Sequence, residues 1–310
     1  MPDLVTLGEA MAALSPGRIG PLRHCRHLDL SIAGSEATVA IGVRRLGHSA
    51  AWISRLGDDE LGALIRSDLQ AESVEVHAIA DTQAPTGLML KERRTADIRR
   101  VHYYRAGSAA SRLQPADLPE GLVESAKILH AGSITPALSP SAAATVNEAI
   151  HRASFVSFDA NFRSKLWSPQ DFRHWVLPVL PSIDLLFAST EEARILLAQG
   201  DDDPPALAKA LRELGPRTVV LTMGAQGAVS TDPEGVHEAA AVQVTEIDPV
   251  GAGDSFVAGY LASLLDGADA ATRMRSATRV AAFSVAAHGD WEGLPTAAEL
   301  ATATTSDINR

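Results

Sequence analysis

The sequence is short of several features that would point to particular classes of protein. It has one cysteine, Cys25, among 310 residues, so no intrachain disulfide can form and a reducing compartment is expected. No uninterrupted apolar run approaches the length of a membrane-spanning helix, and the first residues, MPDLVTLGEA, lack the basic and apolar pattern of a signal peptide. Basic residues are outnumbered, with 27 Lys and Arg against 38 Asp and Glu, which disfavours nucleic acid and anionic lipid as partners. We therefore expect a cytoplasmic protein that binds neither nucleic acid nor membrane.

Short β-rich runs alternate with longer helix-like stretches along most of the chain. The runs are Leu4–Leu7, Ala51–Ser54, Phe155–Asp159, Leu185–Ala188 and Thr218–Thr222, and the stretches are Glu36–Leu46, Asp59–Gln70, Ala142–Arg152, Glu191–Ala198 and Pro205–Leu214. Strands that alternate with helices in this way pair in parallel and carry helices on both faces of the sheet. The pattern therefore predicts an α/β fold with a mostly parallel central sheet.

One region departs from this alternation. Thr86–Glu92 and Arg99–Tyr104 are two β-like runs with no crossover helix between them, which is typical of an antiparallel hairpin. Together with Leu28–Ile32, this hairpin is expected either to form a small lid beside the main sheet or to be an edge hairpin without a function of its own.

The stretch Asp248–Phe256, DPVGAGDSF, carries the clearest chemical signal. Its small residues Gly251, Ala252 and Gly253 precede a helix-like run, so several backbone N–H groups can point at one anion at the start of a helix. Asp254 follows directly, where a carboxylate opposes phosphate binding unless it takes a proton from an attacking hydroxyl. An anion hole with a base beside it suits phosphoryl transfer from a nucleotide to an alcohol. The alternative is a plain helix start that Asp254 only caps.

DPVGAGDSF resembles the C-terminal signature of the ribokinase-like (PfkB) carbohydrate kinases, usually written DTxGAGD. The other matching segments, in the family's order, are TLGEAMAALSP, AGSEATVAIGVRRLG, SRLGDDELG and TMGAQG. The resemblance extends over nearly the whole chain. It implies a ribokinase-like three-layer α/β/α fold in a single domain, 1–310, with a β lid formed by about residues 17–33 and 84–106.

The resemblance also implies roles for individual residues in an ATP- and Mg²⁺-dependent reaction. Asp254 is the expected catalytic base, and Gly251, Ala252 and Gly253 form the anion hole. Glu192 and Asp248 are the expected metal-site residues. The expected nucleotide-binding residues are Ser189, Thr222, Gly224, Gly227, Gly251, Gly253 and His288, of which Ser189 replaces the family's usual asparagine.

A second informative stretch, Asp159–Trp167 (DANFRSKLW), follows an apolar strand at the edge of the sheet where ligands of such folds collect. Arg163 in this stretch can hold a carboxylate by two parallel hydrogen bonds, which a neutral sugar would not require. The alternative is a surface arginine that only forms ion pairs.

This stretch, together with YYRAGSAAS and HAGSITPALS, resembles one subgroup of the family, the 2-keto-3-deoxygluconate kinases. The resemblance implies that the C6 hydroxyl of this keto acid is phosphorylated, with Arg163 on the carboxylate. The expected substrate residues are Gly34, Thr38, Tyr103, Arg105, Ile134, Asn161, Arg163 and Asp254, of which Thr38 replaces the family's usual asparagine.

Several alternatives stay open at this point. The same chemistry could act on fructose, ribose or 2-keto-3-deoxygalactonate, and a catalytically silent sugar sensor would keep the same fold. A nicotinamide-dependent dehydrogenase is disfavoured, because Gly8 is followed by EAMAALSPG and not by a G-x-G-x-x-G turn. Monovalent-cation activation is undecided, and a projecting lid favours a homo-oligomer.

Overall fold

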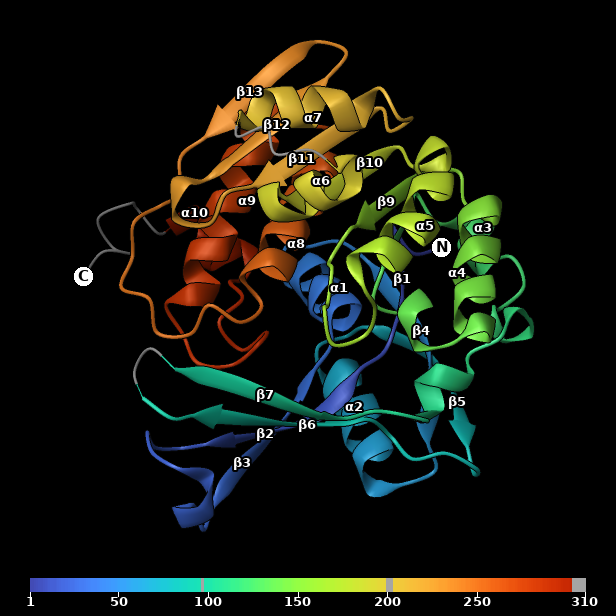
Figure 1. Cartoon of the computed structure of the whole chain (residues 1–310), viewed down its shortest axis with the longest axis vertical. Coiled ribbons are helices and arrows are strands. Elements are labelled where there is room, and N and C mark those ends of the chain that lie inside the picture. The colour runs from blue at the N-terminus through green and yellow to red at the C-terminus, as the bar shows by residue number, and fades with distance from the viewer. Residues whose placement is uncertain (96–97, 199–202, 303–310) are drawn as a thin grey trace.

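The computed structural model describes residues 1–95, 98–198 and 203–302, which form two sheets with helices around the larger one (Figure 1). The larger, sheet A, runs in the order β13 (Gly235–Ala239), β12 (Ala228–Asp232), β11 (Thr218–Thr222), β10 (Leu185–Ser189), β9 (Val156–Asp159), β8 (Ile128–Gly132), β1 (Leu4–Leu7), β4 (Ala50–Gly57) and β5 (Glu75–Asp81). All neighbours from β11 to β5 pair in parallel, whereas β12 and β13 are antiparallel. The mostly parallel sheet is therefore confirmed.

Helices cover both faces of sheet A, as the alternating pattern predicts. One face carries α3 (Leu122–Ser125), α4 (Pro140–Arg152), α5 (Pro169–Val179), α6 (Thr190–Leu197) and α7 (Pro204–Arg212). The other carries α1 (Ser35–Arg45), α2 (Glu60–Ala71), α8 (Ala252–Leu265) and α9 (Ala270–Val285), with α10 (Ala297–Thr302) beside them. Leu185 and Phe187 of β10 enter one core, and Leu186 enters the other. Strands buried on both faces explain why these runs are continuously apolar.

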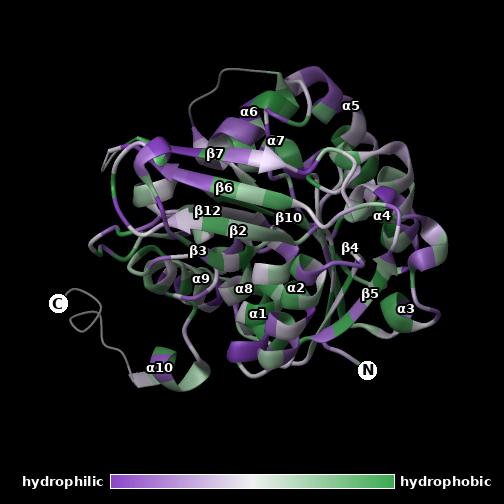
Figure 2. Cartoon of the chain, turned by 90° about the horizontal axis from the view of Figure 1, so that it is seen from below, coloured by the Kyte–Doolittle hydropathy of each residue, from purple (hydrophilic) through white to green (hydrophobic). Residues whose placement is uncertain are grey.

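Sheet B has the order β3 (Leu28–Ala33), β2 (Met11–Pro16), β6 (Leu88–Arg93) and β7 (Arg99–Tyr104). The predicted hairpin is present, because β6 and β7 pair antiparallel, while β2 and β6 pair in parallel. Figure 2 shows that the hairpin is hydrophilic at the end where β6 finishes and β7 begins, in keeping with the arginines there. Sheet B also includes β2, which the expected lid ranges leave out.

The described helices all fall short of the length and hydrophobicity that crossing a bilayer requires.

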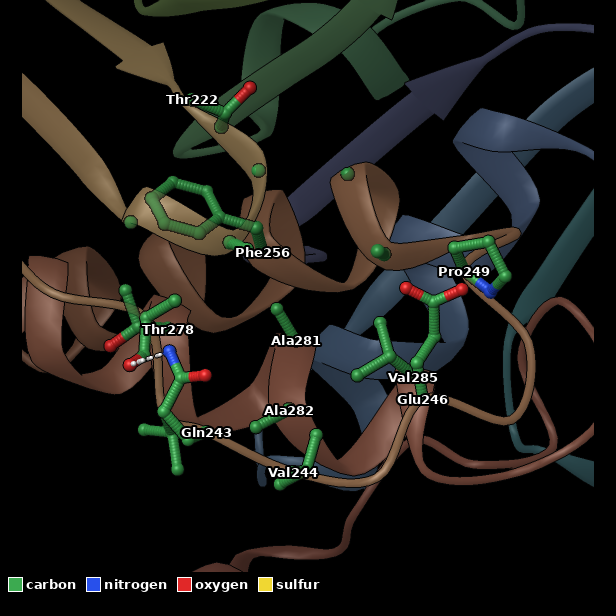
Figure 3. A pocket seen from close by; sticks show the side chains of 17 residues that line it. Thr222, Gln243, Val244, Glu246, Pro249, Phe256, Thr278, Ala281, Ala282 and Val285 are labelled. Atoms are coloured by element: carbon green, nitrogen blue, oxygen red, sulfur yellow. Dashed lines mark hydrogen bonds between the residues drawn. The ribbon is translucent and has the colours of Figure 1, made fainter. Parts of the chain in front are cut away.

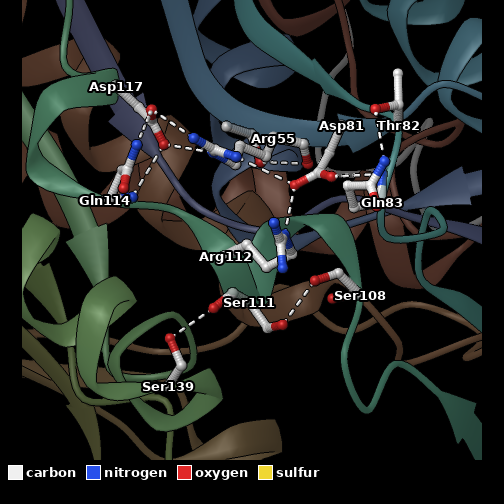
Figure 4. A network of polar contacts seen from close by, with 11 residues as sticks. Arg55, Asp81, Thr82, Gln83, Ser108, Ser111, Arg112, Gln114, Asp117 and Ser139 are labelled. Carbon is white, nitrogen blue, oxygen red and sulfur yellow. Dashed lines mark hydrogen bonds and ion pairs between the residues drawn. The ribbon is translucent and has the colours of Figure 1, made fainter.

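A buried polar network ties the end of sheet A to the segment after the hairpin (Figure 4). Arg55 on β4 donates to both carboxylate oxygens of Asp117, at 2.5 and 2.9 Å, and to Asp81 at the end of β5, at 3.1 Å. Arg112 reaches the same Asp81 at 2.7 Å. Buried carboxylates need such partners, because an unpaired charge away from water is costly.

Candidate active site

Asp254 and the N-termini of two helices meet at the carboxyl edge of sheet A. Asp254 lies in the first turn of α8, and the hydroxyl of Ser35, the first residue of α1, donates to its Oδ1 at 2.5 Å. Asn161, just after β9, donates from its side-chain amide to the Ser35 Oγ at 3.0 Å and has a positive φ of 36°. The structure thus brings together Asp254 and Asn161, which the sequence nominated separately, through a serine that it did not nominate.

The surroundings of Asp254 act on its carboxyl group in opposite directions. Burial raises the pKa of Asp254, while the Ser35 hydrogen bond and the positive charge of Arg163 lower it. Arg163 itself is exposed, and within the part of the chain that the structure describes its guanidinium makes no hydrogen bond or ion pair. A cation near Asp254 whose side chain has no hydrogen-bond or ion-pair partner is available to an anionic ligand.

The predicted anion hole is a tight turn that leads into α8. Gly251 caps the helix with a φ of 79°, and a Cβ on it would lie 2.2 Å from the carbonyl oxygen of Asp290. Only glycine fits this backbone. A Cβ on Gly253, in contrast, would meet nothing within 4 Å, so the turn faces open space. The geometry suits an anion that approaches the backbone N–H groups of a helix N-terminus.

A pocket of about 290 Å³ opens beside this turn (Figure 3). Its lining includes the predicted residues Thr222, Gly224, Gly227, Ala252 and Gly253. Ala225, from the turn between β11 and β12, also lines it. The other lining residues are mostly apolar and come from the segment after β13 and from α8 and α9: Ala241, Val242, Gln243, Val244, Glu246, Pro249, Phe256, Thr278, Ala281, Ala282 and Val285. A mostly apolar pocket beside a helix N-terminus that can bind an anion suits a nucleotide base.

Three of the expected nucleotide residues lie outside this lining, namely Ser189, Gly251 and His288. Gly251 is the N-cap of α8, directly before the lining residue Ala252. His288 is exposed on the loop after α9, and Ser189 caps α6 by accepting a hydrogen bond from the Glu192 N–H at 3.1 Å. Sequence analysis did not predict most of the side chains that line the pocket. Small apolar residues such as Ala281 have the same sequence pattern at a pocket wall as in the hydrophobic core.

Acidic side chains gather where β9 and β10 end. The Glu192 carboxylate accepts from the backbone N–H groups of Phe162, at 2.7 Å, and Ser189, at 2.6 Å. Burial and the nearby charges of Glu192 and Asp254 raise the pKa of Asp159 well above its usual range. A cation would relieve this repulsion, so the residues fit a divalent metal ion in this region.

The protein does not supply a full coordination shell for such an ion. Among residues 1–95, 98–198 and 203–302, no three His, Cys, Asp or Glu side chains are arranged to hold a metal. The contacts of Asp248, the other expected metal residue, are with Arg99, 3.5 Å from its Oδ1, and with the Val250 N–H, which donates to the same oxygen at 3.3 Å.

Two of the expected substrate residues lie at the start of α1, namely Gly34 and Thr38. Gly34 caps this helix, and a Cβ on it would lie 2.7 Å from the carbonyl oxygen of Glu9, so the two chain segments approach closely. Ile134 is half-buried just after β8. Thr38 is only 1% exposed in the second turn of α1, which leaves little of its side chain for contact with a ligand.

The expected substrate residue Tyr103 lies on β7, and Arg105 directly follows this strand. Tyr103 shares the inner face of sheet B with Met89, and the charged groups of Arg105 and Lys165 lie 5.6 and 5.3 Å from its ring centroid. Its neighbour Tyr104 points to the opposite face and is 62% exposed, as the alternation of a strand requires. Both predicted lid residues therefore face the sheet A side.

Arg105 is held by a carboxylate that the sequence did not nominate. It forms an ion pair with Glu9, which is fully buried, and the Ser108 hydroxyl donates to the other Glu9 oxygen at 2.5 Å. The Nε of Arg105 is buried and has no hydrogen-bond partner among the described residues. A donor in this state is available to a ligand oxygen.

This arrangement of an acid, an anion-binding turn and an apolar pocket is that of a phosphotransferase with an alcohol group as acceptor. Residues 1–297 match the pfkB family of carbohydrate kinases. The chain belongs to this family, and it is a sugar kinase with the ribokinase-like three-layer fold.

Individual relatives cover almost the whole chain. The 2-dehydro-3-deoxygluconokinase of Thermoproteus tenax is 38% identical over 305 residues, which are 96% of this chain and 93% of that protein. The 2-dehydro-3-deoxygalactonokinase of Haloferax volcanii is 35% identical over 294 residues, which are 93% and 92% of the two chains. An uncharacterized sugar kinase from Pyrococcus horikoshii, solved in complex with ATP, superposes with a TM-score of 0.85 at 26% identity, covering 98% of this chain and 99% of that chain.

Proposed function

We propose that this kinase transfers the γ-phosphoryl group of ATP to the C6 hydroxyl of 2-keto-3-deoxygluconate, also called 2-dehydro-3-deoxygluconate. The observation that carries the proposal is the exposed guanidinium of Arg163, which influences Asp254 electrostatically and has no partner in the described protein. A carboxylate on the sugar supplies that partner, and a neutral sugar does not. The names of the relatives from Thermoproteus tenax and Haloferax volcanii support a keto acid.

In this proposal each group of the chain has a defined task. Asp254 accepts the proton of the hydroxyl, and Ser35 holds its carboxylate in place from α1. The N–H groups of the turn Gly251–Gly253 face the transferring phosphoryl and offset its charge. Tyr103 and Arg105 cover the sugar from the lid, and Asn161 and Gly34 line the opposite side.

The pocket beside the turn is the proposed adenine site, with Phe256 and Val285 among its apolar walls. The carboxylates of Glu192 and Asp159 would hold Mg²⁺ through water molecules. When bound, this ion neutralises phosphate charge and keeps the phosphoryl group in line with the hydroxyl.

A kinase for 2-keto-3-deoxygalactonate is the main competing function, because it also offers a carboxylate to Arg163 and one relative carries that name. The two acids differ in the orientation of one hydroxyl. Fructose and ribose fit less well, since neither gives Arg163 an anionic partner.

The test is an ADP-release assay with Mg-ATP that compares both keto acids, fructose and ribose, with Asp254→Asn as control. Turnover confined to the keto acids supports the proposal, and the ratio of their kcat/KM values identifies the preferred isomer. Turnover of a neutral sugar alone would keep the kinase and overturn the keto-acid proposal.

The outer face of sheet B supports a homo-oligomer formed through the lids. Leu28, Leu30 and Tyr104 lie on this face and are 38%, 50% and 62% exposed. Exposed apolar residues that share one face of a sheet favour association with a second copy. Light scattering of the protein and of Leu30→Lys checks this: a dimer or larger assembly should dissociate in the variant.

A further inference from the structure

The lid touches the phosphate-binding side of the site through two cations on its inner face. The first is Lys91 of β6, whose amino group forms an ion pair with Asp290 on the loop after α9. The side chains are only 13% and 9% exposed, so the contact is largely removed from water. Breaking a buried pair by removing one partner leaves an uncompensated charge, which the surroundings must move or neutralise.

Asp290 in turn contacts the anion-binding turn. A Cβ on Gly251 would lie 2.2 Å from the Asp290 carbonyl oxygen and 3.0 Å from its carbonyl carbon, so the two backbones are in direct contact. The position of Asp290 therefore limits where Gly251, and the N–H groups that follow it, can lie.

The second cation, Arg99 of β7, contacts the residues directly before the same turn. Its guanidinium donates to the carbonyl oxygen of Ile247 at 3.0 Å and lies 3.5 Å from the Asp248 carboxylate. The N–H of Ile247 is itself bound to the carbonyl of Val285 at the end of α9, at 2.8 Å. The hairpin thus contacts two segments next to Gly251–Gly253. Arg99 contacts the residues directly before this turn, and Lys91 contacts Asp290, whose backbone packs against Gly251.

The same hairpin carries residues on the sugar side of the site. Tyr103 lies four residues after Arg99 on β7, and the Lys165 amino group reaches the carbonyl of Val101 at 2.5 Å from the loop after β9. The β6–β7 hairpin therefore has residues on both the proposed sugar side and the proposed phosphate-binding turn.

We propose that Lys91 is a positioning residue that acts through Asp290 on the anion hole: its ion pair holds the loop that contacts Gly251. This rests on the proposed function in assuming that the nucleotide phosphates bind at this turn. Lys91 touches neither reactant in this scheme. Its ion pair holds Asp290 in position, and Asp290 in turn limits the position of the Gly251 backbone.

The test compares Lys91→Met, Lys91→Arg and Arg100→Met in the full-length protein. Arg100 is exposed on the outer face of the same hairpin and provides the matched loss of a cation. Amide hydrogen exchange of the peptide spanning residues 247–256 is measured without ligands, and kcat/KM for ATP is measured at saturating sugar.

We expect Lys91→Met to speed exchange in this peptide and to lower kcat/KM for ATP, each by about 5–50-fold, a usual range for coupling between two sites. Lys91→Arg keeps the positive charge, so both values should stay close to those of the native protein. Arg100→Met should leave both values unchanged. Asp290→Asn, which is close in size to the native residue, should match Lys91→Met, and the double variant should be no worse than the worse single variant if both act through one pair.

Unchanged exchange in Lys91→Met overturns the inference, as does an equal effect of Arg100→Met or additive losses in the double variant. Because exchange is measured without sugar or nucleotide, its result does not depend on the substrate. Failure of every sugar in the ADP-release assay would overturn the proposed function and leave the exchange result to decide the role of Lys91.

Discussion

The Ser35 hydroxyl donates a 2.5 Å hydrogen bond to the carboxylate of Asp254, although the two residues are 219 positions apart in the chain. The bond joins the first residue of α1 to the first turn of α8, so two helix N-termini meet at one carboxylate. A hydrogen bond to the ionised form favours that form and opposes the effect of burial on the pKa of Asp254.

Replacing Ser35 should therefore change the pH dependence of catalysis. In Ser35→Ala the pKa of Asp254 loses an interaction that lowers it, so the acidic limb of the kcat/KM profile should move to higher pH. The loss of a hydrogen bond worth about 0.5–1.5 kcal/mol corresponds to up to about one pH unit. Ser35→Thr keeps the hydroxyl and should keep the profile. A profile lowered equally at all pH values would show that Ser35 does not tune the base.

Asp254→Asn tests the base itself. The amide cannot accept the hydroxyl proton, so turnover should fall by about 10²–10⁴-fold, the usual contribution of a general base. Nucleotide binding, measured by calorimetry with a non-hydrolysable analogue, should be retained because the pocket residues are unchanged. Near-normal turnover would rule out Asp254 as the base.

Arg163→Ala tests recognition of the acid group. Loss of a charge-assisted hydrogen bond of about 1.5–3 kcal/mol should lower kcat/KM for keto acids by about 10–150-fold. Whatever activity exists on fructose should change little, since a neutral sugar makes no such bond. An equal loss on both classes of sugar would indicate a structural role for Arg163.

Glu36 should make stability depend on pH. Its carboxyl group lies against Gly8 and Gly132, and a Cβ on these glycines would lie 2.2 and 3.1 Å from its oxygens. Burial raises the pKa of Glu36 from 4.5 to about 8. Between these values the folded state holds a proton that the unfolded state has released, so the free energy of unfolding falls as pH rises from about 4.5 to about 8.

Glu36→Gln mimics the protonated acid and removes this dependence. Urea unfolding at pH 5 to 8.5 should show that the variant gains stability relative to the native protein as pH rises, by at most about 1.4 kcal/mol per pH unit. Parallel curves for the two proteins would show that Glu36 is already ionised in the folded state.

The Arg55 network should contribute strongly to stability (Figure 4). Arg55→Met leaves Asp81 and Asp117 buried without their shared partner and should lower the free energy of unfolding by about 3–5 kcal/mol. Arg112→Met is the matched control: its side chain is 51% exposed and binds the same Asp81, so it should cost about 0–1 kcal/mol. Similar losses in the two variants would contradict the role of burial.

The sequence alone determined the fold class and the main chemical motif, because both depend on local pattern. Continuous apolar runs such as Val219–Leu221 predict strands buried on both faces, and the glycines before Asp254 predict an anion-binding helix start. The antiparallel hairpin and the opposite orientation of Tyr103 and Tyr104 also followed from local rules.

Only the tertiary structure decided which distant residues meet the motif. Nothing near Ser35 or Lys91 in the chain marks one as the partner of Asp254 and the other as the partner of Asp290. The walls of the pocket beside Gly253 were equally hidden from sequence analysis, since an alanine that faces a cavity and one that faces the core have the same local sequence pattern. Such contacts depend on how whole helices and strands pack at the edge of sheet A, and residue type and spacing along the chain do not specify that packing.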